Sequence, residues 1–397
     1  MRYGSRTSRV NRRWGVILAG GDGVRLQPLT RIACGDSRPK QFCPLLGGKT
    51  LLARTQNRIA GIIEPEQTVF ALTRTHEQYY SRTLETIPST RKVEQPANRG
   101  TLPAILWSLL RVIRADEEAL VAFLPSDHYI ANEPTFVSAL SSAFAFVQTH
   151  RDRVVLLGAS ADRPEREYGW IEPGGAMTHG FFRVKHFWEK PSHETAQHLL
   201  ERNCLWNTFV MVGSASALLS MARRAVPNIV AAFEEILSGA GIPEEQRMRE
   251  FYRNLAPADF SRDVLSASTE ALVVSDCGEI GWNDLGDPGR ASAHNRWEQF
   301  GAWLEEMRPS LTDRAWHGAR GWAYAKLLAH NGHKLRALWL YLNAVFRGCY
   351  RLRLAAVIFL QIILAAKSYR ALADAGIGWL RLGLRAKSLP HKFPEPA

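Results

Sequence analysis

Short apolar runs alternate with amphipathic stretches along most of this chain, and this alternation constrains the fold more than any other feature. The apolar runs predict strands over residues 15–19, 68–73, 121–125, 154–158 and 272–275. The amphipathic stretches predict helices over residues 51–61, 76–86, 102–113, 135–149, 194–201, 214–225 and 229–237. Strands that alternate with helices need crossover connections, so we expect an α/β fold, a mostly parallel mixed sheet flanked by helices on both faces. Ligands of such sheets bind at the carboxyl ends of the strands.

The net charge of +12 is unevenly distributed along the 397 residues. Residues 1–307 carry 35 basic and 35 acidic side chains, whereas residues 308–397 carry 15 basic and 3 acidic ones. A smaller basic cluster at the start consists of Arg2, Arg6, Arg9, Arg12 and Arg13. Because the excess lies at the two ends, we expect no nucleic acid among the partners. We divide the chain into a basic extension (1–13), the α/β domain (14–300) and a basic helical C-terminal tail (301–397).

The tail predicts helices over residues 327–342 and 350–373. Its longest apolar run, residues 354–366, is shorter than the roughly twenty residues that cross a membrane. Basic residues on both sides of the run suit an interfacial helix on anionic lipid, and equally a helix packed on the body or on another subunit of a homo-oligomer.

The five cysteines are scattered without a C-x-x-C pair, which favours reduced thiols. The basic start of the chain lacks the apolar segment of a signal peptide. We therefore expect a cytoplasmic protein.

A glycine-rich segment, LAGGDGVRLQPLT at residues 18–30, follows the first predicted strand, and RPKQF follows at 38–42. Without Cβ atoms at Gly20, Gly21 and Gly23, backbone N–H groups can close on phosphate oxygens. Arg25 can donate a forked pair of hydrogen bonds to a polyphosphate, and Lys40 adds a point charge. The segment predicts a polyphosphate site.

Two familiar phosphate-binding patterns do not fit these residues. The dinucleotide fingerprint G-x-G-x-x-G needs a glycine where Leu26 stands, and the P-loop pattern, tried on residues 47–50, needs one at Cys43. A structural turn after a strand is the alternative for a lone G-G-x-G, but the basic residues that follow favour phosphate binding.

The two segments together resemble the signature of the sugar-1-phosphate nucleotidyltransferases, or nucleotide-sugar pyrophosphorylases, whose fold is Rossmann-like. The ending Lys40-Gln41-Phe42 resembles the bacterial mannose-1-phosphate guanylyltransferase branch. The span between Thr30 and Pro39 is longer than in most members. Six motifs in the family's order cover residues 14–290, and the resemblance implies the roles that follow.

The second and third motifs are EQPANRGTLPAI, residues 94–105, and LPSDHYI, residues 124–130. The resemblance implies that Gln95, Asn98, Thr101 and Ser126 contact the nucleotide, and that Asp127 binds Mg²⁺. The alternatives are a plain capped helix start at 101 and a turn-forming aspartate. We interpret the neighbouring His128 as structural.

The fourth and fifth motifs are EYGWIEPG (167–174) and the pair FWEKP (187–191) with WNTFV (206–210). The resemblance implies that Gly169, Glu172, Glu189 and Asn207 contact the sugar and that Lys190 binds its phosphate. Most members read Asn-Ser-Gly where this chain has residues 207–209, Asn-Thr-Phe, and we expect the added side chain to narrow the pocket. Read alone, these motifs would be core packing and a solvated turn.

The sixth motif, GWNDLGDPGR at residues 281–290, places Asp284 where the family has its second metal-binding acid. Asp127 and Asp284 can share one Mg²⁺ only if the fold brings them together. An aspartate in a glycine-rich turn is the alternative.

The implied reaction transfers a nucleotidyl group from a nucleoside triphosphate to a sugar 1-phosphate, with GTP and mannose 1-phosphate as the favoured pair. The expected catalytic residues are Arg25, Lys40, Asp127, Lys190 and Asp284. UTP, dTTP or ATP with another sugar 1-phosphate is the first alternative. A catalytically silent module that binds a nucleotide sugar is the second.

Overall fold

The computed structural model describes residues 12–24, 27–44, 49–178, 180–285, 304–305, 307–330, 334–350 and 352–363. The chain divides into two compact units, residues 1–288 and 289–397, and each is described by itself. The boundary predicted after residue 300 lies outside the described residues, and both predicted boundaries stay predictions.

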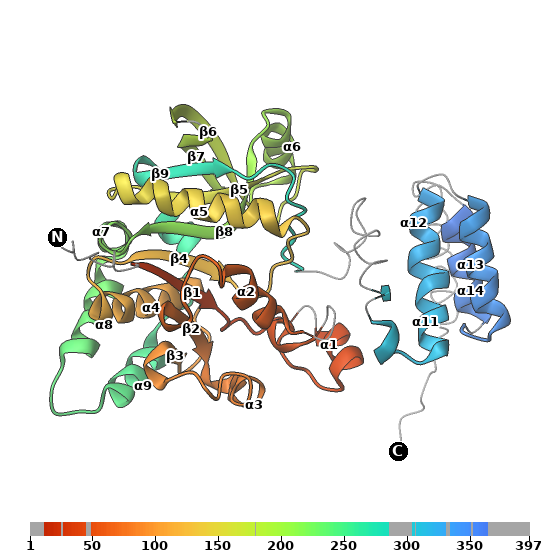
Figure 1. Cartoon of the computed structure of the whole chain (residues 1–397), viewed down its shortest axis with the longest axis horizontal. Coiled ribbons are helices and arrows are strands. Elements are labelled where there is room, and N and C mark those ends of the chain that lie inside the picture. The colour runs from red at the N-terminus through yellow and green to blue at the C-terminus, as the bar shows by residue number, and fades with distance from the viewer. Residues whose placement is uncertain are drawn as a thin grey trace, which may run out of the picture. The chain divides into compact units, whose positions relative to one another are not determined.

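One mixed sheet forms the centre of the first unit (Figure 1), with nine strands in the part of the chain that the structure describes. The strands are β1 (Arg13–Leu18), β2 (Thr68–Thr73), β3 (Lys92–Gln95), β4 (Leu120–Pro125), β5 (Val154–Ser160), β6 (Gly169–Thr178), β7 (Phe181–Glu189), β8 (Leu205–Ser214) and β9 (Leu272–Asp276). Their order is β3-β2-β1-β4-β8-β5-β9-β7-β6, and β6 also pairs with β8. The pairs β3–β2, β2–β1, β1–β4 and β5–β9 are parallel, and the others are antiparallel. The predicted α/β fold with a mixed sheet is confirmed.

Helices cover both faces of this sheet, as predicted. The described helices of this unit are α1 (Gln27–Cys34), which packs beside Cys43, and α2 (Leu51–Ile59), α3 (Glu77–Tyr80), α4 (Thr101–Ala115), α5 (Glu133–Thr149), α6 (His193–Glu201), α7 (Ala215–Ala225), α8 (Pro227–Ser238) and α9 (Glu244–Asn254), which pack on the sheet. Short 3-10 turns are η2 (Lys40–Phe42), η3 (Pro65–Gln67), η4 (Arg74–His76), η5 (Ser89–Arg91) and η7 (Thr269–Ala271), and η6 (Ser261–Leu265) is a π-helical turn.

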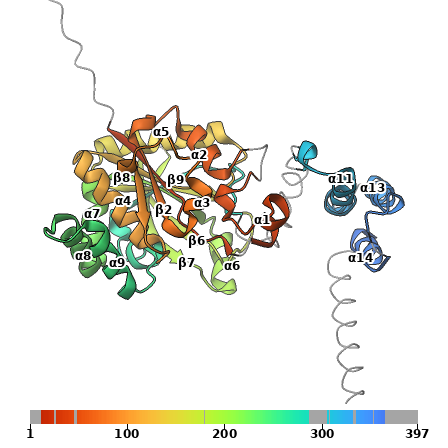
Figure 2. The same ribbon diagram turned by 90° about the horizontal axis from the view of Figure 1, so that it is seen from below.

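The alternation of side chains along the strands builds two separate cores. Val16 and Val121 face the core that α4, α7 and α8 cover, and Ile17 and Ala122 face the core that α2 and α5 cover. Figure 2 shows these two groups of helices on opposite sides of the sheet. Burying the apolar strand residues on both faces stabilises the sheet by roughly 25 cal/mol for each Å² of apolar surface removed from water.

Side-chain caps determine where four of the helices begin. Thr50, Asn132, Ser192 and Ser214 each accept a hydrogen bond from the backbone N–H three residues later. Such a cap satisfies one of the unpaired N–H groups of a first helical turn. As a result α2, α5, α6 and α7 all begin within two residues of the predicted starts.

Strand register gathers several chain segments at one edge of the sheet. Leu18 pairs with Pro125 in the parallel pair β1–β4, so the segments after these residues leave the sheet side by side. The backbone N–H and the hydroxyl of Ser126 both donate to the Leu18 carbonyl oxygen, at 3.1 Å and 2.7 Å. Because β8 is antiparallel to β4, its amino end lies at this same edge.

Four strands, two helices and most of a third helix differ from the prediction. Strands β3, β6, β7 and β8 lie outside the predicted strand ranges, α1 and α9 lie outside the predicted helix ranges, and α3 covers only four of the residues predicted as helix over 76–86. These strands mix polar and apolar residues without strict alternation, so their pairing depends on contacts far apart in the sequence.

The expectation that all five cysteines are reduced thiols is wrong for two of them. Cys34, the last residue of α1, and Cys43, directly after η2, form a disulfide with Cα atoms 6.6 Å apart, so these two are not the predicted thiols. Their spacing has no familiar signature, and only the return of the chain from α1 to η2 brings them together. Cys204, Cys277 and Cys349 are free, and burial raises the pKa of the first two to about 11 and about 12.

The described part of the second unit is helical, as predicted for the tail. Its elements are η9 (Arg308–Ser310), α11 (Asp313–Ala319), η10 (Arg320–Tyr324, π-helical), α12 (Ala325–His330), α13 (Lys334–Phe346) and α14 (Leu352–Ile363). The helix predicted over 327–342 spans the end of α12 and most of α13, and the one predicted over 350–373 extends beyond the described residues. A buried apolar cluster joins α12, α13 and α14. None of the described helices has the length and apolar character needed to span a bilayer.

Candidate active site

The glycine-rich segment leaves the carboxyl end of β1 with its carbonyl groups tied to the protein. Gln41 donates to the carbonyl oxygens of Ala19 and Gly21, at 3.0 Å and 2.7 Å. The Thr73 hydroxyl donates to the Gly20 carbonyl oxygen at 2.9 Å. In a trans peptide the C=O and the following N–H point in opposite directions, so the N–H groups of residues 20–22 are turned away from these contacts. This is the arrangement that a backbone anion site requires.

The loop also holds one carboxylate between two partners. Gly23 has a φ of +58°, a conformation that glycine adopts readily. One oxygen of Asp22 lies 3.0 Å from His76 Nε2, and the other accepts from Asn98 Nδ2 at 2.9 Å. Burial lowers the pKa of His76, and the Asp22 carboxylate opposes this change. His76 was not predicted, because no pattern in the sequence links positions 22 and 76, and Arg25 lies outside the described residues.

Two residues of the second motif face the protein interior. Tyr252 donates to Gln95 Oε1 at 2.9 Å, and the Gln95 side chain is almost fully buried. The Thr101 hydroxyl donates to Asp259 at 3.1 Å and accepts from the backbone N–H of Phe260 at 2.9 Å. The first contact joins the end of β3 to α9, and the other two join the start of α4 to the segment after α9, so both residues support the motif from the protein side.

A buried lysine connects the third and sixth motifs. The side chain of Lys40 is 8% exposed, and its Nζ lies 3.1 Å from Asp127 Oδ2. The same Nζ donates to the backbone carbonyl of Asp284. An antiparallel bridge between Tyr129 and Asn283 holds the two segments together, with hydrogen bonds of 2.8 Å and 3.0 Å. The fold therefore brings the Asp127 carboxylate and the Asp284 backbone carbonyl, 157 positions apart, to one ammonium group.

The aromatic residues behind this cluster keep His128 neutral. Trp282 Nε1 donates to His128 Nδ1 at 3.2 Å, which places the imidazole proton on Nε2, 3.7 Å from Asp127. Burial lowers the pKa of His128, although the Asp127 carboxylate opposes this. The contacts agree with the structural role expected for this histidine.

The oxygen atoms around Lys40 are of the kind that Mg²⁺ binds. In the described part of the chain, no three His, Cys, Asp or Glu side chains gather as a complete metal site. Mg²⁺ typically takes only one or two carboxylates from a protein and completes its shell with phosphate oxygens and water. The Lys40 ammonium lies between the Asp127 carboxylate and the backbone carbonyl of Asp284, whose own carboxylate accepts from Tyr168, so oxygen atoms from both segments gather here.

Three strands place the sugar-motif residues side by side. Gly169 pairs with Glu189 across β6–β7, and the β6–β8 register sets the same position beside Asn207. A Cβ atom on Gly169 would lie 3.1 Å from Glu189 Oε2 and 3.2 Å from Asn207 Cβ, so glycine leaves room here that any other residue would fill. Tyr168, the preceding residue, donates to Asp284 Oδ1 at 3.0 Å and so connects these residues to the Lys40 cluster.

The surroundings of the Glu189 carboxyl disfavour its ionised form. Its side chain is 19% exposed, and burial raises its pKa to about 7, with the Asp259 carboxylate adding to the rise. Lys190 and Arg262 oppose it, and Lys190 Nζ is 4.0 Å away. Lys190 itself has a φ of +50° at the end of β7.

Residues 207–209, Asn-Thr-Phe where most family members have Asn-Ser-Gly, include a strained backbone conformation. Phe209 has a φ of +60°, within an irregularity of the β5–β8 pairing, and an aromatic residue rarely adopts this conformation. Its N–H donates to Asn207 Oδ1 at 3.0 Å, while the Thr208 hydroxyl donates to the Leu157 carbonyl at 2.7 Å. The chain thus keeps a glycine-like bend at a position where it has a phenylalanine.

The structure does not bring Glu172 to this group. Glu172 pairs with His186 in the β6–β7 register, three positions along from Gly169, so its side chain is on the opposite face of the sheet. There it contacts Lys185 and His186 at 3.0 Å and 2.9 Å and also Arg202. Two cationic side chains and a histidine occupy its oxygens, so we do not carry its predicted sugar contact further.

Residues 14–293 match the family described as nucleotidyl transferase. The chain belongs to the nucleotidyl transferase family.

Two relatives of this nucleotidyl transferase domain show how much of the chain is shared. Mannose-1-phosphate guanylyltransferase 2 of Escherichia coli O157:H7 is 31% identical over 288 residues, which cover 68% of this chain and 57% of that protein. The xanthan biosynthesis protein XanB of Xanthomonas campestris pv. campestris is 32% identical over 282 residues, with the same two shares. The chain therefore spans little more than half the length of these relatives.

A solved structure agrees with the fold. The crystal structure of mannose-1-phosphate geranyltransferase from Thermus thermophilus superimposes with a TM-score of 0.61 at 30% sequence identity, over 69% of this chain and 76% of that one. The Rossmann-like nucleotidyltransferase fold expected from the sequence is thus confirmed.

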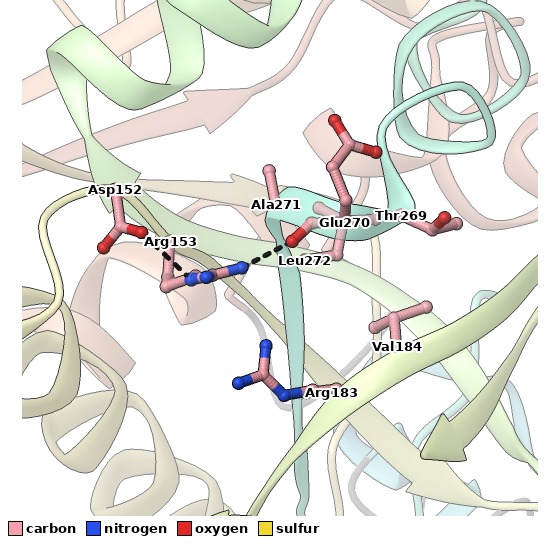
Figure 3. A pocket seen from close by; sticks show the side chains of 8 residues that line it. All are labelled: Asp152, Arg153, Arg183, Val184, Thr269, Glu270, Ala271 and Leu272. Carbon is pink, nitrogen blue, oxygen red and sulfur yellow. Dashed lines mark hydrogen bonds and ion pairs between the residues drawn. The ribbon is translucent and has the colours of Figure 1, made fainter. Parts of the chain in front are cut away.

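A cavity of the nucleotidyl transferase domain lies away from the candidate residues (Figure 3). It measures about 500 Å³ and is lined by Asp152, Arg153, Arg183, Val184, Thr269, Glu270, Ala271 and Leu272. Six of these residues lie at the amino ends of β5 and β9, and Arg183 and Val184 lie in β7, which pairs with β9. Asn207, in contrast, pairs with Gly158 near the carboxyl end of β5. The cavity is therefore not part of the site.

Proposed function

We propose that this nucleotidyl transferase domain transfers a nucleotidyl group from a nucleoside triphosphate to a sugar 1-phosphate, with GTP and mannose 1-phosphate as substrates. The observation that carries the proposal is the Lys40–Asp127–Asp284 cluster. It adjoins the glycine-rich loop through β1 and β4, and it adjoins the Gly169, Glu189 and Asn207 group through Tyr168. A cation-binding cluster between an anion loop and a polar strand group is what two phosphorylated substrates require.

The reaction needs positioning more than acid–base chemistry. A phosphate oxygen of the sugar 1-phosphate attacks the α-phosphorus of the triphosphate, a new P–O bond forms, and the bond to the β-phosphate oxygen breaks. The attacking phosphate is already an anion, so no residue has to remove a proton from it. The protein must hold two polyanions in line and stabilise the charge that develops on pyrophosphate.

The residues of this chain divide these tasks. The N–H groups of the loop at Gly20, Gly21 and Gly23 bind the triphosphate, and Arg25 and Lys40 neutralise the leaving pyrophosphate. Breaking the Lys40–Asp127 pair frees the ammonium for phosphate.

The sugar side has its own set of contacts. Lys190 binds the phosphate of the nucleophile, and its side chain is 58% exposed and so accessible. Glu189 and Asn207 hydrogen-bond the sugar hydroxyls above Gly169. Gln95, Thr101 and Ser126 act indirectly, by holding the loop and the start of α4 in place.

Asp127 and Asp284 are the residues that would hold Mg²⁺. The ion, when bound, would neutralise charge on the phosphates at the reacting centre.

The choice of base and sugar rests on the relatives. The Escherichia coli relative is a mannose-1-phosphate guanylyltransferase, and residues 40–42 of this chain resemble that branch. Because the identity is about 31% and the relatives are longer, the pair GTP and mannose 1-phosphate is a proposal that needs its own test.

The test is pyrophosphate release by the full chain with Mg²⁺. GTP, UTP, dTTP and ATP are each combined with mannose, glucose and N-acetylglucosamine 1-phosphates, and Asp127→Asn is the inactive control. We expect the highest kcat/KM with GTP and mannose 1-phosphate. A higher value with another pair would keep the reaction class and overturn the substrates. A folded chain that binds a nucleotide sugar but releases no pyrophosphate with any pair would overturn the enzyme proposal in favour of a silent binding module.

A further inference from the structure

Helix α13 of the second unit, drawn in blue in Figure 1, is apolar on two opposite faces. One face packs into the core of the unit, through Ala337, Leu340, Tyr341 and Ala344. The other face is the α13 stripe, formed by Leu335 (86% exposed), Trp339 (64%), Leu342 (39%) and Phe346 (85%). The stripe residues recur at intervals of four, three and four, so they line one side of the helix, about 180° from the buried set.

Such a stripe is unusual for a surface helix. Single exposed apolar side chains are normal, but a continuous row of two large aromatics and two leucines marks a surface that another body covers. The apolar cluster that joins α13 to α12 and α14 contains Ala337, Leu340 and Tyr341, with Leu338 and Val345 packed against it, and it includes none of the stripe residues. The stripe is therefore available to a partner.

The charge around the stripe indicates what the partner is. Arg336 and Arg347 are exposed and fall on one flank of the stripe, about 100° around the helix from its centre. The sequence from residue 314 to residue 373 contains ten Lys and Arg and no Asp or Glu. An apolar surface flanked by exposed arginines complements an anionic partner with an apolar interior.

We propose that the α13 stripe docks the protein on the surface of an anionic lipid bilayer. Leu335, Trp339, Leu342 and Phe346 enter the boundary between headgroups and acyl chains, and the arginines on the flank contact lipid phosphates. Tryptophan is enriched at this depth of a membrane because its ring is apolar and its N–H is polar.

The structure favours this occupant over a second copy of the chain. Two copies that met through this face would bring together two segments with no acidic residue between 314 and 373, so like charges would oppose the contact. A helix lying flat on the bilayer also agrees with the short length of α13, thirteen residues, which does not cross a membrane. The inference does not depend on the proposed reaction.

The test is co-flotation of the full chain with vesicles. One set contains phosphatidylcholine alone and the other contains about one third phosphatidylglycerol. The native chain is compared with the double variant Trp339→Gln/Phe346→Gln, which leaves the buried face intact, and with Arg336→Gln/Arg347→Gln. The matched control is Ile242→Gln, because Ile242 is a large apolar side chain, 47% exposed, in the first unit. Circular dichroism verifies that each variant is folded.

We expect binding to anionic vesicles that falls at least about tenfold in the stripe variant and about fivefold for each arginine removed. The Ile242 control should bind like the native chain. Equal binding to neutral and anionic vesicles, or no loss in the stripe variant, would overturn the proposal. So would a native chain that ignores vesicles and whose mass by light scattering falls to one copy in the stripe variant, since the stripe would then be a subunit interface.

Discussion

Replacing Glu189 with glutamine should stabilise the protein at pH 8 and change its stability much less at pH 5. The reason is that burial raises the pKa of this carboxyl to about 7, whereas an exposed glutamate has a pKa of 4.5. Between these two values the folded chain keeps a proton that the unfolded chain has released. The native chain therefore loses stability as the pH rises from about 4.5 to about 7, and glutamine, which cannot ionise, avoids this loss.

The size of the effect follows from the pKa difference. One pKa unit corresponds to about 1.4 kcal/mol, so a difference of about 2.5 units costs the native chain about 3 kcal/mol at pH 8 and about 1 kcal/mol at pH 5. Because the side chain is only 19% exposed, solvent screening reduces this value modestly. We expect the advantage of Glu189→Gln over the native chain to grow by about 2 kcal/mol between the two pH values.

Urea unfolding of the full chain, followed by tryptophan fluorescence at pH 5 and pH 8, measures this difference. The matched control is Glu172→Gln on the opposite face of the sheet. That carboxylate contacts Lys185, His186 and Arg202, so its loss should destabilise the chain, in the opposite direction to the Glu189 change. If the Glu189 variant shows the same advantage at both pH values, or a loss at pH 8, then burial does not hold this carboxyl neutral and the reasoning is wrong.

Three further substitutions test the connections within the site. Tyr168→Phe removes the hydrogen bond to Asp284 and should lower kcat about tenfold with little change in KM, as initial rates would show. Gly169→Ala adds a Cβ atom 3.1 Å from a carboxylate oxygen and should raise the KM for sugar 1-phosphate about tenfold while unfolding stays near native; an unchanged KM would place the sugar elsewhere. Thr101→Val removes the bond to Asp259 and should cost about 1–3 kcal/mol in urea unfolding while kcat stays within a fewfold of native, and a large loss of kcat instead would mean direct nucleotide contact.

The parallel core of the fold was predictable because its strands are local and apolar. Val16, Phe70, Phe123, Leu156 and Val274 lie in runs that are buried on both faces, and such runs stand out from the amphipathic helices between them. The antiparallel strands are different. β7 alternates buried residues with exposed cations over only part of its length, so its partner is set by β6 and β9 and not by its own pattern.

The candidate site was predictable where an acidic residue follows the carboxyl end of a predicted strand. Asp127 directly follows a buried strand, and its neighbourhood with Lys40 and Asp284 needs only the family's order of motifs. The support contacts were not predictable, because the partners of Gln95 and Asp22 are single residues far away in the sequence. No periodicity or spacing marks such a pair.

The sequence also does not distinguish motif residues that contact the ligand from those that only support the site. A polar residue in a family motif can face the ligand or the protein, and only the fold distinguishes the two. Gln95 and Ser126 are buried against backbone and tyrosine partners, and Glu172 is turned to the far face by the alternation of β6. The sequence marks these positions as part of the site, but it does not indicate whether each side chain faces the ligand or the protein interior.

The most direct test of the central claim, that Asp127 and Asp284 act together on one cation, is a double-mutant cycle. We would measure kcat for pyrophosphate release at saturating Mg²⁺ in Asp127→Asn, Asp284→Asn and the double variant. Each single change should lower kcat by about 10²–10³, by analogy with the loss of one preorganised electrostatic group. If both residues serve one ion, the double variant should lose less than about tenfold more than the worse single variant. Losses that multiply, to about 10⁴ or beyond, would contradict the claim, as would a single variant with native kcat.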